Sequence, residues 1–167
     1  MRKTILLLTI AAVLLSPTAG PGQDPHRGRL RDVLPDNGLD KSSVVVLRDQ
    51  ASLNAHYYLA DEAVLELDRQ TDAAFARYRT DTRDALILAV AYPAVEDAKR
   101  VYGRFGHDFF SKKFDQGSPR FLEELETGDW AAVSRKGPFL IVVLEAPDRK
   151  ACDALLRRIE EKVITLF

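Results

Sequence analysis

The chain has 167 residues, of which 46% are hydrophobic and 29% charged, and this composition is that of a globular protein and not of a disordered one. Its formal net charge of -1 argues against a nucleic-acid binder, because such proteins concentrate basic residues on one face to neutralise phosphates. The single cysteine, Cys152, excludes an intramolecular disulfide and a cysteine-based metal cluster.

Residues 1–22 have the pattern of a secretory signal peptide. Arg2 and Lys3 precede an apolar stretch from Ile5 to Leu15, which is shorter than the roughly 20 residues that a membrane-spanning helix needs. We therefore expect cleavage near Gly22, a periplasmic or secreted protein, and no stable membrane span after processing.

Residues 23–40 are rich in Gly, Pro, Asp and Arg, which predicts an extended lead-in before a single domain over residues 41–167. The β-branched run at 43–47 predicts a short strand. Over residues 51–67, apolar side chains recur roughly at helical spacing, so this segment is expected to be helical.

The second half of the chain alternates hairpins with amphipathic helices. A hairpin is predicted from 72–79 and 85–92, followed by a helix after Pro93 with an apolar stripe that ends near Phe109. Residues 121–125 are expected to form a short turn of helix. A second hairpin at 130–135 and 139–145 then leads into a final helix, from 149 to 165, with Cys152 on its apolar face.

This order predicts an α+β fold: an antiparallel sheet built from two hairpins, with two long helices packed on one face. The apolar surroundings of Cys152 favour an inert buried thiol over a reactive one.

Candidate site residues lie in two segments. His56 and the following Asp61 or Glu62 could transfer protons one or two helical turns apart, although tyrosines interleaved with leucines favour a core or rim role for this segment. Tyr57, Tyr58 and Trp130 could together form an aromatic binding rim. The alternative for Trp130 is a place in the core.

Motifs of known chemistry are not apparent. The serines include no nucleophile motif, and the three histidines lack the spacing of a metal site, so we expect no metal and no cofactor. Residues 103–106 (GRFG) resemble a phosphate loop only superficially, and a helix irregularity or C-cap is favoured there. The acidic segment at 121–130 lacks the spacing of a calcium loop.

Six segments between residues 34 and 147, taken together, form a recognisable pattern of tyrosines, strand composition and segment order. They are LPDNGL (34–39), HYYLADEAVLEL (56–67), FARYRT (75–80), ALILAVAYP (85–93), EDAKRVYGRF (96–105) and KGPFLIVVLEAP (136–147). Together they resemble the C-terminal half of a family of exported bacterial proteins of unknown function. The resemblance implies export and an α+β fold. It assigns no functional residue.

Three functional hypotheses follow. The leading one is a non-enzymatic periplasmic or secreted domain that binds an envelope or extracellular partner through Tyr57, Tyr58 and Trp130. The second is a small hydrolase or isomerase using His56 with Asp61 or Glu62. The third is a structural module that helps assemble an envelope complex.

Overall fold

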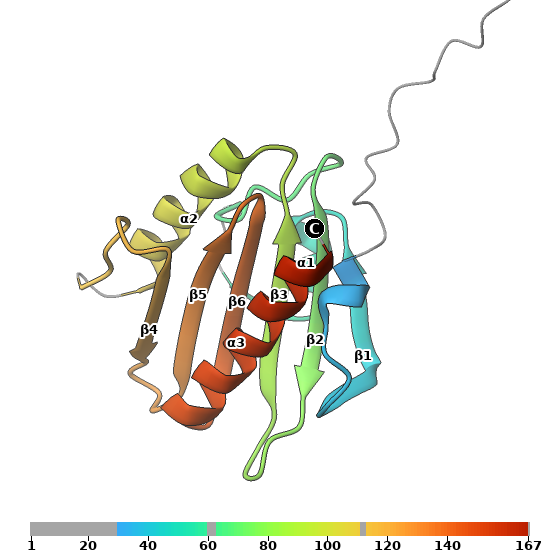
Figure 1. The fold of residues 1–167 in the computed structure, drawn as a ribbon, viewed down its shortest axis with the longest axis vertical. Helices are drawn as coiled ribbons and strands as arrows, with labels where there is room; N and C mark the ends of the chain where they lie inside the picture. Colours follow the sequence, from blue (N-terminus) through green and yellow to red (C-terminus); the bar gives the residue numbers. More distant parts are fainter. Residues whose placement is uncertain (1–29, 60–62, 111–112, 167) are drawn as a thin grey trace, which may run out of the picture.

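The computed structural model describes residues 30–59, 63–110 and 113–166, and the segment predicted as a signal peptide lies outside them. One sheet runs through the middle of the molecule (Figure 1), with strand order β1-β2-β3-β6-β5-β4 and antiparallel pairing between all neighbours. The strands are β1 (Leu39–Leu47), β2 (Asp72–Tyr78), β3 (Ala85–Ala91), β4 (Arg120–Glu124), β5 (Trp130–Lys136) and β6 (Phe139–Ala146). The helices are the 3-10 turn η1 (Leu30–Val33), α1 (Gln50–Asn54), α2 (Val95–Phe109) and α3 (Arg149–Leu166).

The α+β class and the antiparallel sheet are confirmed. Both predicted hairpins are present, as β2 with β3 and as β5 with β6, and the second strands of the two hairpins pair with each other at the centre of the sheet. The sheet is wider than two hairpins, because β1 and β4 add an edge strand on either side.

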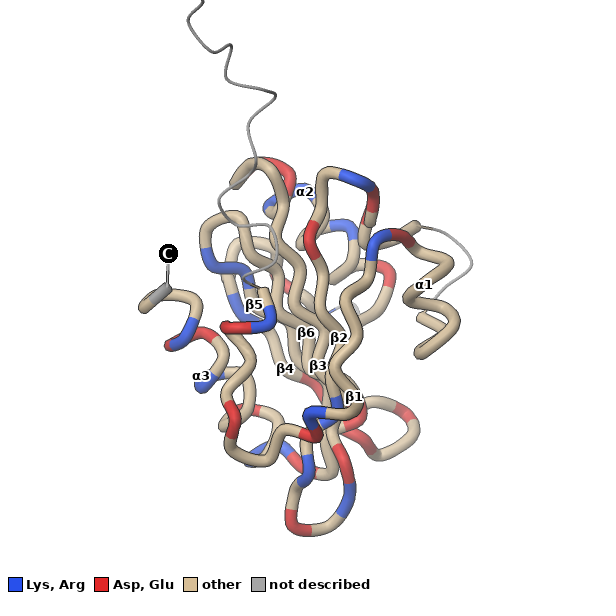
Figure 2. The backbone as a smooth tube through the Cα atoms, turned by 90° about the vertical axis from the view of Figure 1, so that its right-hand side faces the viewer, with Lys and Arg blue, Asp and Glu red and all other residues tan. Residues whose placement is uncertain are grey.

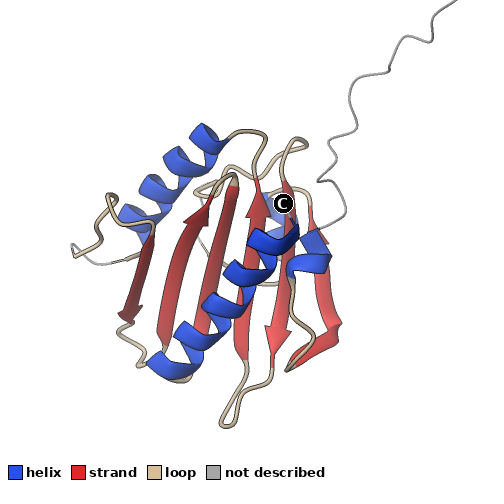
Figure 3. Ribbon diagram, viewed as in Figure 1, coloured by secondary structure: helices blue, strands red, loops and turns tan. Residues whose placement is uncertain are grey.

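The prediction that both long helices pack on one face is wrong. Side chains alternate between the two faces of a strand. Leu88 and Val90 of β3 belong to one buried cluster with Val101 and Phe105 of α2, which we call the α2-side core. Ile87 and Ala89 belong to a second cluster with Cys152 and Leu155 of α3, which we call the α3-side core. Figure 3 shows α3 crossing in front of the sheet, and Figure 2 shows α1 on the side opposite α3.

Both faces of the central strands are covered because both are apolar. Every residue of β6 except Glu145 is buried, and every residue of β3 except Leu86. A continuous apolar strand is typical of a sheet that is covered on both faces. The two helices therefore lie on opposite faces, in a three-layer arrangement.

The helix predicted over 51–67 is largely wrong. Among the described residues of this segment only Gln50–Asn54 is helical, and this helix begins with a capping box in which Asp49 accepts a hydrogen bond from the Ser52 N–H at 2.8 Å. Of the described residues that follow, Val64, Leu65 and Leu67 are buried in the α2-side core without helical structure. Adjacent buried residues such as Val64 and Leu65 do not fit one helical stripe.

Two further segments differ from expectation. Residues 121–125 were expected to be helical, but most of this segment lies in the edge strand β4, where Phe121 packs on the α2-side core and Leu122 on the α3-side core. Leu30 and Val33 of η1 are 1% and 0% exposed, so the folded domain begins before residue 41, and the described part of the predicted lead-in is packed.

Candidate functional site

A pocket of about 360 Å³ opens beside the first half of α3, and we call it the α3 pocket. Because α3 crosses the sheet diagonally (Figure 1), its N-terminal half lies away from the start of β1 and the end of β2, which are neighbours in the sheet. The pocket is walled by the start of β1, by the turn between β2 and β3, and by α3. Its lining residues are Asn37, Gly38, Tyr78, Arg79, Thr80, Asp81, Thr82, Asp148, Lys150, Ala151, Ala154, Leu155 and Arg158.

Local backbone interactions hold the walls of the pocket. Gly38 adopts a φ of +82°, which only glycine accepts without strain, and its carbonyl accepts a hydrogen bond from the Arg79 N–H at 2.7 Å. Asp148 caps α3 by accepting a hydrogen bond from the Ala151 N–H at 2.8 Å. The turn between β2 and β3 is thus tied to the start of β1, and the start of α3 is fixed by its own cap.

Arg158 and the buried Tyr78 both line the pocket, and the two side chains are in contact. The guanidinium carbon of Arg158 is 5.9 Å from the centre of the Tyr78 ring, and its Nη1 donates to the Asn37 carbonyl at 3.1 Å. Its Nε is buried and has no hydrogen-bond partner. Burial raises the pKa of Tyr78, and the nearby Arg158 opposes this effect only in part. Tyr78 therefore stays neutral and donates to the Pro35 carbonyl at 2.9 Å.

The charged side chains at the mouth of the pocket differ in whether they interact with the rest of the fold. Lys150 and Arg79 are exposed, and neither side chain forms an ion pair with the rest of the described chain. The Asp148 carboxylate is occupied by its helix cap. This site was not indicated by the sequence, because Arg79 lies at the end of the predicted strand 72–79 and Arg158 on the charged face of the final predicted helix.

The predicted aromatic rim is divided between the two faces of the sheet. Tyr57 packs against the α2-side core, next to Phe75, with ring centroids 6.2 Å apart. Trp130 packs against the α3-side core, where the Arg149 guanidinium lies 5.7 Å from its ring centre. Tyr58 is 63% exposed. The role of Tyr57, Tyr58 and Trp130 as one binding surface stays a prediction.

The Tyr57 hydroxyl lies near two carboxylates, one of which directly precedes Trp130. Burial raises the pKa of Tyr57 to about 12, and the neighbouring carboxylates of Glu145 and Asp129 add to this effect. Glu145 adopts a left-handed φ of 54° where β6 is out of register with β5. Asp129 pairs with Arg83. The sequence did not indicate this cluster, since its members come from four separate segments.

The proposed proton-transfer pair is not shown. His56 is exposed, and its ring lies 6.5 Å from that of Phe75. Asp61 and Glu62 lie outside the described residues. The role of His56 with either carboxylate stays a prediction.

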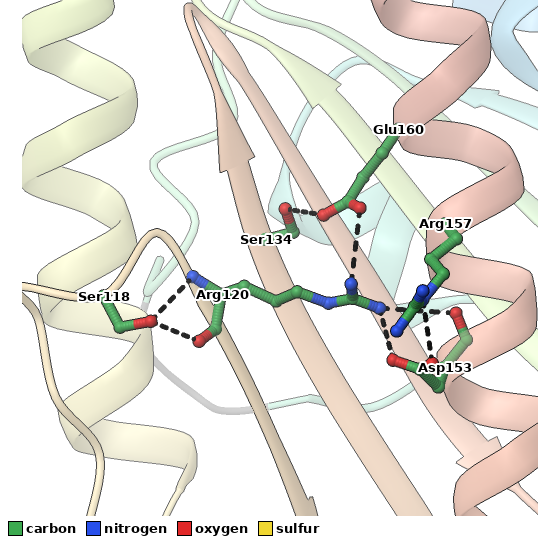
Figure 4. Close-up of polar contacts among 6 residues, drawn as sticks. All are labelled: Ser118, Arg120, Ser134, Asp153, Arg157 and Glu160. Atoms are coloured by element: carbon green, nitrogen blue, oxygen red, sulfur yellow. Dashed lines mark hydrogen bonds and ion pairs between the residues drawn. The ribbon is translucent and has the colours of Figure 1, made fainter.

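A polar network beneath α3 connects the helix to β4 and β5 (Figure 4). Ser134 donates to Glu160, and the Arg120 guanidinium lies 2.5 Å from an Asp153 carboxylate oxygen and 3.7 Å from one of Glu160. Ser134 is 0% exposed and Glu160 is 8% exposed, so substrates cannot reach this serine. We interpret the network as a structural clamp on α3.

Cys152 is buried, and burial raises the pKa of its thiol to about 12. The predicted place of Cys152 in the core is confirmed, and its low reactivity stays a prediction. Within the described residues, no cluster of three or more His, Cys, Asp or Glu side chains is placed to hold a metal ion. None of the helices in the described ranges is both long and apolar enough to cross a membrane.

Comparison with known proteins adds no assignment. No protein-family model matches the chain, and no curated protein matches it. The resemblance to an exported family of unknown function therefore stays a prediction from the residues.

Proposed function

We propose that the chain is an exported, non-enzymatic binding domain and that its ligand site is the α3 pocket. The observation that carries this proposal is the pocket itself, whose volume of about 360 Å³ is within the range of roughly 300–1,000 Å³ of small-ligand sites. The ligand would be a small molecule of the envelope or the extracellular medium.

The groups that line the pocket favour binding over catalysis. They include no histidine, cysteine or serine, the residue types that most often act as general base or nucleophile. Two of the remaining polar groups are already engaged in the fold, since the Asp148 carboxylate caps α3 and the Tyr78 hydroxyl donates to Pro35. Positioning and holding a ligand is the role that remains for this site.

The pocket also replaces the aromatic rim as the proposed contact surface. Tyr57 and Trp130 pack against different faces of the sheet, which argues against a single concave site that uses both rings. The pocket, in contrast, brings three chain segments to a single concave site.

Filling the pocket tests the proposal. Ala154 is exposed and lines the pocket, so Ala154→Trp should block ligand entry without disturbing the core. Glu161→Trp is the matched control, because Glu161 is also exposed and lies two turns further along the same face of α3. A fragment library screened by NMR should yield ligands that bind the wild-type chain and Glu161→Trp and not Ala154→Trp. Ligands that bind all three proteins equally would refute the assignment.

Export is tested separately by expressing the full chain in a bacterium and fractionating the cells. A shortened chain outside the cytoplasm is expected, because residues 1–22 should be removed on export. A full-length chain dissolved in the cytosol would contradict export.

A further inference from the structure

We propose that the α3 pocket selects ligands with an anionic head group, a carboxylate or a phosphate, attached to a short apolar body. The inference rests on the proposed function of the pocket and names its ligand class. Three cationic side chains line the pocket, Arg79, Lys150 and Arg158. None of them is neutralised by an ion pair within the described chain.

These cations differ from most other arginines of the described chain. Six of the eleven other described arginines have carboxylate partners within 4.0 Å, namely Arg77, Arg83, Arg100, Arg104, Arg120 and Arg157. The pocket also contains two carboxylates, Asp81 and Asp148, of which Asp148 accepts one backbone hydrogen bond as the cap of α3. The three cationic side chains outnumber the two carboxylates by one, so the lining has a net positive formal charge.

The guanidinium of Arg158 is held in place where it lines the pocket. It is held by the Asn37 carbonyl at 3.1 Å and by the Tyr78 ring, and its Nε is buried without a partner. A buried donor without an acceptor is unfavourable. Carboxylate and phosphate oxygens fit the planar fork of an arginine better than a neutral acceptor does.

The rest of the pocket indicates what is attached to the anion. Ala151, Ala154 and Leu155 present an apolar wall along α3, and the hydroxyls of Thr80 and Thr82 lie on the opposite turn. Because the N–H of Ala151 is already bonded to Asp148, the anion is expected to meet the cationic side chains and not the end of the helix. The apolar wall would receive a short hydrocarbon body.

Isothermal titration calorimetry with four probes tests this inference. Hexanoate and hexyl phosphate carry the two candidate head groups, hexanamide is their neutral counterpart, and inorganic phosphate lacks the apolar body. At least one of the two hexyl anions should bind roughly ten-fold or more tighter than hexanamide, with an affinity that falls as salt is added. The tighter of the two identifies the head group. Inorganic phosphate binding as tightly as hexyl phosphate would refute the apolar body.

Variants assign the binding to the cations. Lys150→Met and Arg79→Met each remove an exposed charge, and each should weaken the better anion by about two- to five-fold. The two together should weaken it roughly ten-fold or more. Lys162→Met is the matched control, because Lys162 is exposed near the far end of α3 and outside the pocket, and it should leave the affinity unchanged. Equal effects of Lys150→Met and Lys162→Met would refute a role of the pocket cations.

The outcomes separate this inference from the proposed function. Hexanamide binding as tightly as both anions overturns the anion inference and leaves a ligand pocket in place. The same holds if no hexyl probe binds while the fragment screen finds neutral ligands that Ala154→Trp excludes. No ligand in either experiment refutes both.

Discussion

Replacing Gly106 by alanine places a methyl group inside a packed aromatic cluster. A Cβ at Gly106 would lie 2.0 Å from Cζ of Phe114, with two further ring carbons at 2.2 and 2.3 Å. The Phe114 ring is 6% exposed, and its neighbours hold it, with ring centroids at 5.2 Å for Tyr102 and 5.5 Å for Phe121. The ring therefore cannot move away without displacing other buried side chains.

The change in the free energy of unfolding is the cost of fitting the methyl group into the core minus the gain in helix propensity. Alanine favours a helix over glycine by about 1 kcal/mol. Forcing a methyl group into a packed core costs about 1–3 kcal/mol, and expelling a buried phenylalanine ring costs about 3–5 kcal/mol. We expect Gly106→Ala to lower the free energy of unfolding by about 1–3 kcal/mol.

Gly103→Ala is the control, one turn earlier on the same helix. Its Cβ would meet the side chain of Gln116, at 2.3 Å from Nε2, but Gln116 is exposed and can turn into solvent. This variant should therefore leave stability unchanged or raise it by up to about 1 kcal/mol.

Urea unfolding followed by circular dichroism measures both variants. The reasoning requires opposite directions: a lower midpoint for Gly106→Ala and an equal or higher one for Gly103→Ala. If both variants gain stability, Phe114 does not pack against Gly106 of α2.

Three further predictions concern buried polar groups. Glu160→Ala should lower the free energy of unfolding by roughly 3 kcal/mol, because it leaves Ser134 without its buried partner and Arg120 with only Asp153. Glu161→Ala should change it by less than about 0.5 kcal/mol, and equal losses in urea titrations would contradict the clamp. The pKa of Cys152, raised to about 12 by burial, predicts that a thiol reagent at pH 8 labels the chain only after unfolding; rapid labelling of the folded protein would show an accessible thiol. Burial raises the pKa of both Tyr57 and Tyr102 to about 12. In the folded state both keep their protons above the ordinary tyrosine value of 10.0, so the stability they contribute is present below that value and is lost as the pH rises toward 12. Absorbance at 295 nm should show delayed ionisation, and ionisation of every tyrosine at the ordinary value before unfolding would contradict it.

Elements with a strong local pattern could be predicted from the sequence. The stripe that includes Leu155, Ile159 and Val163 defines α3, and the apolar run at 139–145 lies in the centrally paired strand β6. In both, the local pattern and the packing agree, so the sequence is sufficient.

Elements that depend on tertiary packing could not be predicted in the same way. Residues 121–124 have no strand pattern of their own, and they form β4 because β5 offers an open edge. The spacing of apolar residues in 51–67 resembled a helix, although that segment crosses the α2-side core mostly without helical structure. The opposite placement of α2 and α3 was implied by β3 and β6 being apolar on both faces, a consequence that the prediction did not draw.

The candidate site was the least predictable part. Its cations, Arg79, Lys150 and Arg158, are far apart in sequence and look like ordinary surface charges. Only the approach of the β2–β3 turn to α3 brings them into one pocket. The aromatic residues chosen from the sequence were separated for the same reason, since the face on which each ring lies depends on strand register and on the path of the chain.

The most direct test is a two-dimensional NMR titration of the isotope-labelled protein with the better of the two hexyl anions. Saturable shifts are expected at Gly38, at residues 79–82 and at residues 150–158, and they should disappear in Ala154→Trp. Shifts centred instead on Tyr57 or Trp130, or no saturable shift with any ligand of the fragment screen, would contradict a binding site in the α3 pocket.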